Sequence, residues 1–493
     1  MPLDQSQTPL VDALKTCAHR ANAAFYTPGH KRGQGISNRH KALFGTDIFR
    51  ADLPELPELD NLFAPEGVIL KAQALAAEAF GAEQTWFLAN GSTCGIQAAI
   101  LATCGPQDKI ILPRNVHSSA IAGLILSGAT PIYLHPQYNA DWDIPTTITP
   151  AAIAAAISAH PDAKAVLIVS PTYQGICSDL GAIAKLTHSH NIPLIVDEAH
   201  GAHFAFHPQL PPSALSAGAD IAVQSAHKVL SAFTQAAMLH VQGNRIDRNK
   251  MSRCLQLTQS TSPSYLLLGS LDAARHQMAT AGTALMSRTL ELANTAYTAL
   301  SKLSKLKVLQ LHQDNHDHTR LTVQVSSLGL TGFSADDILH EQFGVTAELP
   351  SLHTLTFILS LGNTPSDIHQ LIKGFQALCD VPPQTNITTP SPNKPATLHS
   401  EPATLTPAIA QSSLSPRQAF YATHQPTLAD LAIGQICAET ICPYPPGIPV
   451  LLPGEMITET ALTQLQSLLN AGAMITGCQD ATLQTILTVA NPN

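Results

Sequence analysis

The sequence of 493 residues carries little charge. Only 12% of the residues are charged, and 26 basic against 35 acidic residues leave a formal net charge of −9. No basic block of the kind that binds a phosphate backbone is present, so we expect no nucleic-acid partner. The longest apolar runs, such as residues 120–126, are far shorter than the roughly 20 residues that a membrane-spanning helix needs. We therefore expect a soluble protein without a membrane partner.

Secretion signals and paired cysteines are also lacking. Residues 1–10 contain an acid, polar residues and a proline rather than the basic and apolar segments of a secretory signal. The nine cysteines are an odd number and include no CxxC pair. Reduced, mostly buried thiols are the simplest interpretation, and the cytoplasm is the expected compartment. The length allows roughly three domains at about 150 residues each.

From about residue 83, short apolar runs rich in β-branched residues alternate with longer helical patterns. Near-continuous apolar runs separated by helices are typical of a parallel sheet covered on both faces. The pattern predicts a doubly wound α/β domain, in which ligands lie beyond the carboxyl ends of the strands. The predicted strands are residues 85–89, 109–113, 131–135, 165–170, 193–197 and 221–225.

Composition divides the chain into four segments. Residues 1–243 form the predicted large domain with an N-terminal segment. Residues 244–380 complete it and add a small α+β domain with strands at 321–327 and 354–360. Residues 381–410 are rich in Pro, Thr, Ser and Asn and bury too little apolar surface to order themselves, which predicts a disordered linker. Residues 411–493 regain apolar patterning and predict a C-terminal α+β domain.

The first predicted helix of the sheet domain begins after Asn90 with Gly91, Ser92 and Thr93. A glycine, the free N–H groups of a helix N-terminus and two hydroxyls favour an anion such as phosphate. The spacing fits neither the GxxxxGK[ST] pattern of nucleoside triphosphatases nor the GxGxxG pattern of dinucleotide sites, so the sequence disfavours both functions. A helix-capping turn without a ligand would explain the same residues, and both interpretations stay open.

Other polar side chains follow the predicted strands. His117 could stack on an aromatic cofactor or move a proton, or it could simply cap a helix or fill the core. Asp197, Glu198 and His200 follow residues 193–196, where their desolvation favours a charged ligand nearby. The histidines His200 and His203 lack the acidic partners of the HExxH pattern, so we expect no metal.

Lys228 follows the strand at 221–225 and precedes an apolar segment. Burial lowers the pKa of a lysine and makes it a nucleophile suited to Schiff-base chemistry. Its structural alternatives are to snorkel to solvent or to pair with Glu198. A phosphate cradle, a stacking histidine, a strand-end aspartate and a lysine together provide each contact that pyridoxal phosphate needs.

Several stretches, in order along the chain, resemble the ornithine/lysine/arginine decarboxylase family of fold-type-I pyridoxal-phosphate enzymes. The resemblance runs from residue 26 to the end and leaves the linker unmatched, which predicts the short form without an N-terminal wing domain. The matching stretches are YTPGHKRG (26–33), ADLPELPELDNL (51–62), ANGSTCGIQAAI (89–100), LPRNVHSSAIAGLILSGATPIYL (112–134), SPTYQG (170–175), VDEAHGAH (196–203), QSAHK (224–228), TSPSYLLLGSLDAAR (261–275), SPRQAF (415–420) and PYPPGIPVLLPGE (443–455).

The resemblance implies an aminotransferase-like α/β fold with pyridoxal 5'-phosphate as cofactor. Lys228 would bind the cofactor covalently, Asp197 would pair with its pyridine nitrogen, and His117 would stack on its ring. A hydroxyl of the TSPSY segment would reach the phosphate of a neighbouring subunit, which implies a homodimer or a higher homo-oligomer. The remaining implied cofactor contacts are Ser92, Thr93, Ser225 and His227 to the phosphate, His200, and Thr261 or Ser262 from the neighbour.

The reaction implied by the resemblance is decarboxylation of a basic L-amino acid, in the first place arginine or lysine and after them ornithine. The products would be CO2 and agmatine, cadaverine or putrescine, in polyamine metabolism. Glu455, Asp52 and Glu55 are the candidate anions for the distal cation of the substrate, and Lys228 or His117 would return the proton to Cα. Two alternatives remain: another fold-type-I enzyme, such as an aminotransferase or carbon–sulfur lyase, and a non-catalytic regulatory relative, which would be expected to lack Lys228.

Overall fold

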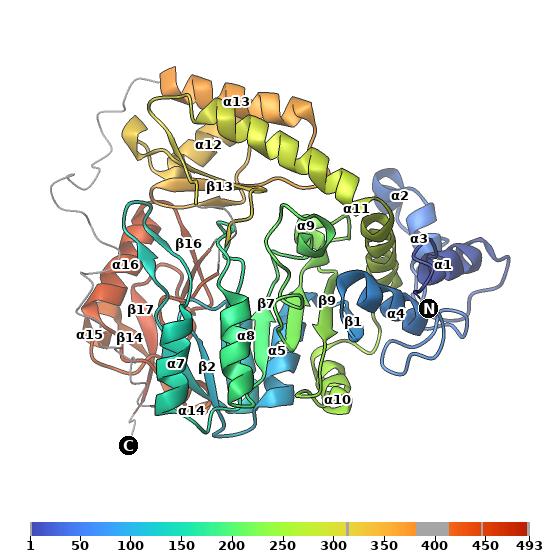
Figure 1. Cartoon of the computed structure of the whole chain (residues 1–493), viewed down its shortest axis with the longest axis horizontal. Helices are drawn as coiled ribbons and strands as arrows, with labels where there is room; N and C mark the ends of the chain where they lie inside the picture. Colours follow the sequence, from blue (N-terminus) through green and yellow to red (C-terminus); the bar gives the residue numbers. More distant parts are fainter. Residues whose placement is uncertain (1, 312–314, 381–413, 445–446, 491–493) are drawn as a thin grey trace. The chain divides into compact units, whose positions relative to one another are not determined.

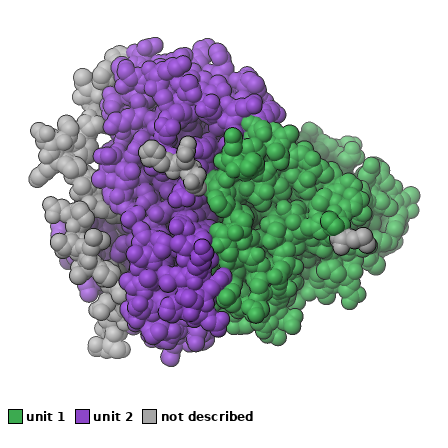
Figure 2. All heavy atoms as spheres, in the orientation of Figure 1, with its two compact units in different colours: residues 1–103, 193–287 green, residues 104–192, 288–493 purple. Residues whose placement is uncertain are grey.

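The computed structural model describes residues 2–311, 315–380, 414–444 and 447–490. The chain divides into two compact units, each assembled from segments far apart in the sequence (Figure 2). Unit 1 comprises residues 1–103 and 193–287, and unit 2 comprises residues 104–192 and 288–493. The predicted linker, residues 381–410, lies outside the described residues, and the four predicted domain boundaries stay a prediction.

Unit 1 holds four strands in the order β1-β9-β8-β7, of which β1, β9 and β7 are labelled in Figure 1. Strands β7 and β8 are parallel, whereas β9 runs antiparallel to both β1 and β8. Their residues are buried almost throughout, as expected for strands covered on both faces. The elements of this unit are α1 (Pro9–His19), α2 (Asn38–Phe44), α3 (Asp47–Ala51), α4 (Val68–Phe80), β1 (Gln84–Leu88), α5 (Gly91–Thr103), β7 (Leu194–Asp197), η1 (Phe204–Phe206), β8 (Ile221–Gln224), α9 (Ala226–Val229), β9 (Ala237–Val241), α10 (Arg248–Thr258) and most of α11 (Tyr265–Leu300).

The close approach of helix α5 to strands β1 and β8 depends on a residue without a side chain. A Cβ atom added to Gly95 would lie 2.7 Å from both Leu88 Cδ1 and Val223 Cγ1. Such distances are too short for a real contact, so only glycine lets the helix lie this near the strands. This packing holds the N-terminus of α5 beside the end of β8.

Unit 2 holds the parallel strands β6, β2 and β3 in that order. Helices α7 and α8 begin at capped residues, since Thr149 accepts from the Ala152 amide and Asp179 from the Ala182 amide. The elements of this part are β2 (Lys109–Pro113), α6 (Ser118–Ser127), β3 (Thr130–Leu134), β4 (Tyr138–Asn139), β5 (Ile144–Pro145), α7 (Pro150–Ala159), β6 (Ala165–Val169) and α8 (Leu180–Ser189).

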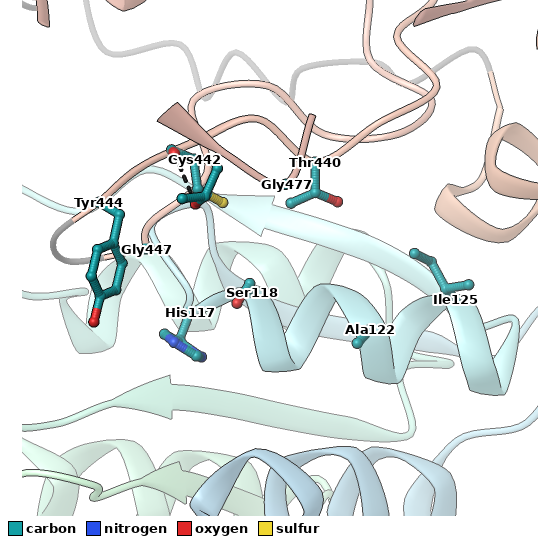
Figure 3. A pocket seen from close by; sticks show the side chains of 10 residues that line it. His117, Ser118, Ala122, Ile125, Thr440, Cys442, Tyr444, Gly447 and Gly477 are labelled. Carbon is teal, nitrogen blue, oxygen red and sulfur yellow. Dashed lines mark hydrogen bonds between the residues drawn. The ribbon is translucent and has the colours of Figure 1, made fainter. Parts of the chain in front are cut away.

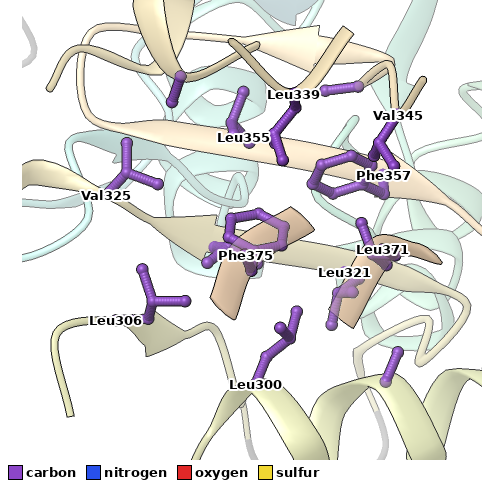
Figure 4. Packing of buried hydrophobic residues seen from close by; sticks show 14 of the residues in the cluster. Leu300, Leu306, Leu321, Val325, Leu339, Val345, Leu355, Phe357, Leu371 and Phe375 are labelled. Carbon is purple, nitrogen blue, oxygen red and sulfur yellow. The ribbon is translucent and has the colours of Figure 1, made fainter. Parts of the chain in front are cut away.

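The predicted small α+β domain follows within unit 2 as an antiparallel sheet in the order β10-β11-β13-β12. Its core packs sheet residues against α11, α12 and α13, and the rings of Phe357 and Phe375 meet edge to face at 5.7 Å (Figure 4). The elements are β10 (Lys307–Val308), β11 (Arg320–Gln324), η3 (Ser326–Leu328), α12 (Gly332–Phe343), β12 (Leu349–Pro350), β13 (Thr354–Ile358) and α13 (Pro365–Asp380).

The C-terminal part of unit 2 pairs β14 with β17 and β15 with β16, both antiparallel. Its own core includes Ile441, Leu451, Leu465 and Ile486. The elements are α14 (Pro416–Tyr421), β14 (His424–Leu428), α15 (Ala429–Ala432), β15 (Cys442–Tyr444), α16 (Glu459–Asn470), β16 (Met474–Thr476) and β17 (Thr485–Val489). In the part of the chain that the structure describes, no helix has the length and apolar character needed to cross a membrane.

Each predicted strand is present, and the sheet strands start and end within one residue of the predicted bounds. The strand predicted at 321–327 is an exception at its end, because β11 stops at Gln324 and Ser326–Leu328 turn into a 3-10 helix. The strand predicted at 354–360 likewise stops at Ile358. Apolar runs locate these strands, whereas the polar residues that follow them leave the exact end open.

Candidate active site

Lys228 lies in the one-turn helix α9, immediately after β8, with its side chain half-buried. Its Nζ lies 3.0 Å from Nε2 of His200, a residue of the segment that follows β7. The amine is therefore held next to an imidazole at the end of a buried strand. A lysine in such surroundings is suited to react with a carbonyl group.

Asp197 is the last residue of β7, and it is buried. In the parallel pair, Asp197 lies opposite Val223 of β8, so the carboxyl ends of both strands meet at one edge of the sheet. One of its carboxylate oxygens accepts a hydrogen bond from the Ala199 amide at 3.2 Å. Asp197 and Lys228 therefore leave the sheet from neighbouring strands on the same edge, as the sequence predicts.

Glu198 belongs to a buried polar network that the sequence did not predict. Its carboxylate accepts hydrogen bonds from the Ala214 amide and from Gln224 Nε2, both at 2.7 Å. The Gln224 amide oxygen accepts from Nε2 of His240 at 3.1 Å, and Nδ1 of His240 accepts from the Thr85 hydroxyl at 2.7 Å. The network connects β1, β9 and β8 with the segment after Asp197.

Burial shifts the pKa values of the two ionisable groups in this network in opposite directions. Desolvation raises the pKa of Glu198 to about 8, although its hydrogen bonds to Gln224 and Ala214 act the other way. Desolvation lowers the pKa of His240 to about 3, so the ring is neutral. Only the strand-end position of Glu198 was visible in the sequence, because its partners lie 16 to 26 residues away.

The predicted phosphate cradle lies at the N-terminus of α5. This helix begins at Gly91, whose φ of +74° favours glycine. Ser92 follows within the first turn, and the Ser225 hydroxyl donates to its Oγ at 2.8 Å. Thr93 is exposed. Free N–H groups at the start of a long helix and these hydroxyls form a donor set that suits a phosphate.

The ring of His227 is held by a hydrogen bond to a nearby backbone carbonyl. Its Nδ1 lies 3.0 Å from the carbonyl oxygen of Ala236, to which its backbone amide also donates. Because a carbonyl can only accept, Nδ1 carries the proton and Nε2 is the ring atom left to meet a ligand. Desolvation lowers the pKa of His227, with the charge of Lys228 acting in the same direction.

Thr261 and Ser262 precede the long helix α11 and are exposed in the single chain. The amide of Ser262 donates to the Ser260 hydroxyl at 3.1 Å, which makes a local turn. Exposed hydroxyls at a helix start are able to reach a neighbouring molecule. Their predicted contact with a neighbouring phosphate stays a prediction.

His117, a residue of unit 2, begins helix α6. Its Nδ1 accepts from the Ser119 amide at 3.2 Å and lies 3.0 Å from the Ser119 hydroxyl. The capping role that the sequence left open is thus present, and it leaves Nε2 on the other side of the ring. His117 also lines a pocket of about 250 Å³ (Figure 3). The other lining residues are Ser118, Ala122, Ile125, Thr440, Cys442, Tyr444, Gly447, Thr476 and Gly477.

The three candidate acids for the substrate cation have different surroundings. Asp52 is partly exposed and lies 3.1 Å from His30 Nε2. Glu55 accepts hydrogen bonds from Asn61 Nδ2 and the Leu62 amide. In unit 2, both carboxylate oxygens of the buried Glu455 accept hydrogen bonds from Arg114, at 2.8 and 2.7 Å.

The histidines after β7 have separate neighbours. His203 packs against the Phe204 ring with centroids 4.8 Å apart, and His207 Nε2 lies 3.0 Å from the Ser287 hydroxyl. Across residues 2–311, 315–380, 414–444 and 447–490, no group of three His, Cys, Asp or Glu side chains is arranged to hold a metal ion.

Comparison with known proteins shows the same relationship along most of the chain. The family model for the major domain of Orn/Lys/Arg decarboxylases matches residues 8–319, and the model for the C-terminal domain matches residues 403–479. An arginine decarboxylase of Bacillus subtilis is 38% identical over 490 residues, which cover 98% of each chain. A lysine decarboxylase of Pseudomonas aeruginosa is 31% identical over 315 residues, 58% of this chain and 42% of its own.

Solved structures show the fold. The lysine decarboxylase of Francisella novicida superposes with a TM-score of 0.81 at 22% identity, over 98% of this chain and 81% of its own. A ureidoglycine–glyoxylate aminotransferase of Bacillus subtilis gives a TM-score of 0.53 at 16% identity, over 63% of this chain and 84% of its own. These likenesses confirm the predicted aminotransferase-like fold. By both its family matches and its full-length similarity to an arginine decarboxylase, the chain belongs to the Orn/Lys/Arg decarboxylase family.

Proposed function

We propose that this chain is a pyridoxal-phosphate-dependent carboxy-lyase that removes CO2 from a basic L-amino acid, with arginine as the first candidate substrate and lysine as the second. The observation that carries the proposal is Lys228 in α9, beside His200 and directly after β8, the strand parallel to the one that ends at Asp197. Arginine is placed first because similarity to the Bacillus arginine decarboxylase spans 98% of the chain, whereas similarity to the Pseudomonas lysine decarboxylase spans 58% of it.

The residues of unit 1 suit three parts of the cofactor, namely its aldehyde, its pyridine nitrogen and its phosphate. Pyridoxal phosphate, when bound, supplies an electron sink for the electron pair that remains at Cα when CO2 leaves. Lys228 would bind the aldehyde carbon through Nζ, and the Asp197 carboxylate would keep the pyridine nitrogen protonated. The N-terminus of α5 with Ser92, Thr93 and Ser225 would bind the phosphate, with His227 Nε2 and His200 as further contacts.

His117 and Lys228 are the candidates for ring stacking and for proton transfer at Cα. We propose that His117 stacks on the ring and that one of these two side chains returns a proton to Cα. Lys228 already contacts an imidazole at 3.0 Å, which gives its amine a neighbour able to exchange a proton.

Among the three candidate acids, Asp52 has the most suitable surroundings for a substrate cation. About a third of its side chain is exposed, and its ion-pair partner is a histidine rather than a lysine or an arginine. Glu55 and Glu455 already accept hydrogen bonds on both carboxylate oxygens. We propose Asp52 as the primary anion for the distal amine or guanidinium, while a role for Glu55 stays a prediction.

The test of this function uses the purified chain mixed with pyridoxal phosphate. After unbound cofactor is removed, the wild type should stay yellow, and Lys228→Ala should be colourless and inactive, because the amine that would bind the cofactor aldehyde is gone. Lys250→Ala, which removes another half-buried lysine of unit 1, is the matched control and should keep both colour and activity.

The substrate follows from the same preparation. Arginine, lysine and ornithine are supplied separately, and CO2 and the amine are measured. We expect agmatine from arginine at the highest kcat/KM. Transamination of these substrates without CO2 release would contradict the decarboxylase assignment and favour an aminotransferase, and a colourless wild type would favour a non-catalytic relative.

We also propose that the enzyme is a homodimer or a higher homo-oligomer and that it works in the cytoplasm. The exposure of Thr261 and Ser262 in the single chain supports a contact with a second copy. All nine cysteines are free thiols, which suits a reducing compartment.

A further inference from the structure

Arg114 connects the sheet of unit 2 to the C-terminal part of the same unit. It follows β2 directly and precedes His117 by three residues. Its Nε and Nη2 donate to the two carboxylate oxygens of Glu455 at 2.8 and 2.7 Å. Both side chains are largely buried, with 14% of Arg114 and 9% of Glu455 exposed. This is a bidentate ion pair of the kind that fixes orientation as well as position.

The remaining donors of Arg114 bind the backbone on the same side. Nη1 donates to the Pro449 carbonyl at 2.9 Å, and Nη2 donates to the Val450 carbonyl at 3.0 Å. Glu455 Oε2 also accepts from the Leu452 amide at 3.1 Å. The guanidinium, 5.8 Å from the ring centre of Tyr133, therefore binds residues 449–455 at three points. We call residues 447–455 the docked loop.

The docked loop reaches His117 at its other end. A Cβ atom added to Gly447 would lie 3.7 Å from His117 Nε2, and Gly447 has a φ of +81°, which favours glycine. Gly447 and His117 line the same pocket, together with Tyr444 (Figure 3). The loop anchored by Arg114 thus forms part of the wall against the ring edge of His117 that faces away from its capping hydrogen bond.

We infer that Arg114 and Glu455 are positioning residues for His117, acting through the docked loop, and that Glu455 does not bind the substrate. The inference rests on the proposed function in one respect, the stacking of His117 on the cofactor. The planar guanidinium of Arg114 can hold the docked loop in one position, whereas the single ammonium of a lysine cannot bind two carboxylate oxygens and two carbonyls at once. Loss of the ion pair should therefore release the loop and let the imidazole ring turn.

The experiment compares Arg114→Lys, Glu455→Gln and the double variant with the wild type. The first readout is the visible circular dichroism of the bound cofactor at saturating pyridoxal phosphate, which reports the asymmetry of the groups around the ring. We expect both single variants to change this signal in the same way as His117→Ala does. Lys109→Met is the matched control, because it removes an ion pair with Asp162 at the opposite end of β2 and should leave the signal unchanged.

The second readout is kinetic. Displacement of a catalytic group lowers kcat, so each single variant should lose on the order of tenfold to a hundredfold in kcat, with a smaller change in KM. The double variant should be no worse than the poorer single variant, because both act through one contact. Glu455→Asp, which keeps the charge, should recover part of kcat relative to Glu455→Gln.

Three outcomes would overturn the inference. A rise in KM for Glu455→Gln alone, with Arg114→Lys unaffected, would mean that Glu455 binds the substrate directly. Wild-type circular dichroism and kcat in both single variants would show that His117 does not depend on the pair. Loss of the far-ultraviolet signal in both would make the pair a general folding requirement. A wild type that releases no CO2 refutes the proposed function instead, and the visible signal still tests the ion pair.

Discussion

Asp197 ends β7, and Lys228 follows the adjacent parallel strand β8 at the same edge of the sheet. Their identities come from local sequence, but their proximity follows from the register that sets Asp197 opposite Val223. Glu198, the next residue, points into a network of buried hydrogen bonds rather than to solvent. Of these two neighbouring residues, Asp197 is the one that we propose for the cofactor, whereas Glu198 belongs to the buried network.

Asp197→Ala should lower decarboxylation by about a hundredfold or more, because nothing then keeps the cofactor nitrogen protonated and the electron pair at Cα loses its sink. Steady-state CO2 release under saturating cofactor measures the effect. Asp179→Ala, which removes the capping carboxylate of α8, serves as the control and should affect stability rather than kcat. Near-normal turnover of Asp197→Ala would refute the assigned role.

Glu198 predicts a pH dependence of stability. Its folded-state pKa of about 8 lies above the ordinary 4.5, so the folded protein holds a proton that the unfolded chain releases, and stability falls as pH rises towards 8. The pKa of His240 is lowered from 6.5 to about 3, so its titration reduces the stability of the folded protein only as the pH falls below 6.5. The interval from pH 6.5 to 8 therefore isolates Glu198 within this network.

Across that interval, the wild type should lose roughly 1–2 kcal/mol more stability than Glu198→Gln, whose amide does not titrate. Denaturant unfolding at several pH values measures the difference. The side chain of Glu198→Gln has only one acceptor oxygen, so either the Ala214 amide or Gln224 loses its hydrogen bond. This loss lowers stability equally at every pH. Parallel curves for the two proteins would show that Glu198 is ionised throughout the range.

At the scale of elements, helix α5 lies close to the strands because of Gly95. Gly95→Ala adds a methyl group 2.7 Å from Leu88 and Val223, so we expect a loss of about 1–3 kcal/mol from overpacking. Gly181→Ala in α8 is the matched control, since its Cβ would lie 3.8 Å from Asp179 Oδ1, an ordinary contact. That variant should be neutral or gain up to about 1 kcal/mol from helix propensity.

Thermal unfolding of the two glycine variants measures the difference, and the cofactor adds a second readout. If Gly95 sets the distance of the α5 N-terminus from Ser225, Gly95→Ala should also bind pyridoxal phosphate more weakly, because the Ser225–Ser92 hydrogen bond lies at that end. Equal melting temperatures for both variants would contradict the packing argument.

At the scale of the whole molecule, the proposed shared site predicts complementation between two defective chains. Lys228→Ala lacks the reactive amine, and the double variant Thr261→Ala/Ser262→Ala lacks the hydroxyls offered to the neighbour. Mixed dimers would contain one site with a complete set of residues. A mixture dissociated and reassociated at limiting cofactor should therefore release CO2 faster than the two separate proteins together, and no gain would indicate that each site is built from one chain.

Local pattern was sufficient for the strands, the helix starts and the motif that leads to the family, because apolar periodicity, capping residues and strand-end glycines act over a few residues. The sequence therefore predicted Lys228, Asp197 and the α5 N-terminus correctly as residues at strand ends. It did not predict the Thr85–His240–Gln224–Glu198 network, which joins residues up to 155 positions apart.

Glu455 is the clearest case of a side chain whose partner the sequence did not predict. Its motif made it one of three candidate anions for a substrate cation, whereas the fold brings Arg114, 341 residues away, against both of its oxygens. Which charge a buried acid meets depends on the three-dimensional packing of distant segments, and nothing in the spacing of either motif encodes that meeting. The chemistry of this protein was thus readable along the chain, and the partners that hold its groups in place were decided by tertiary structure.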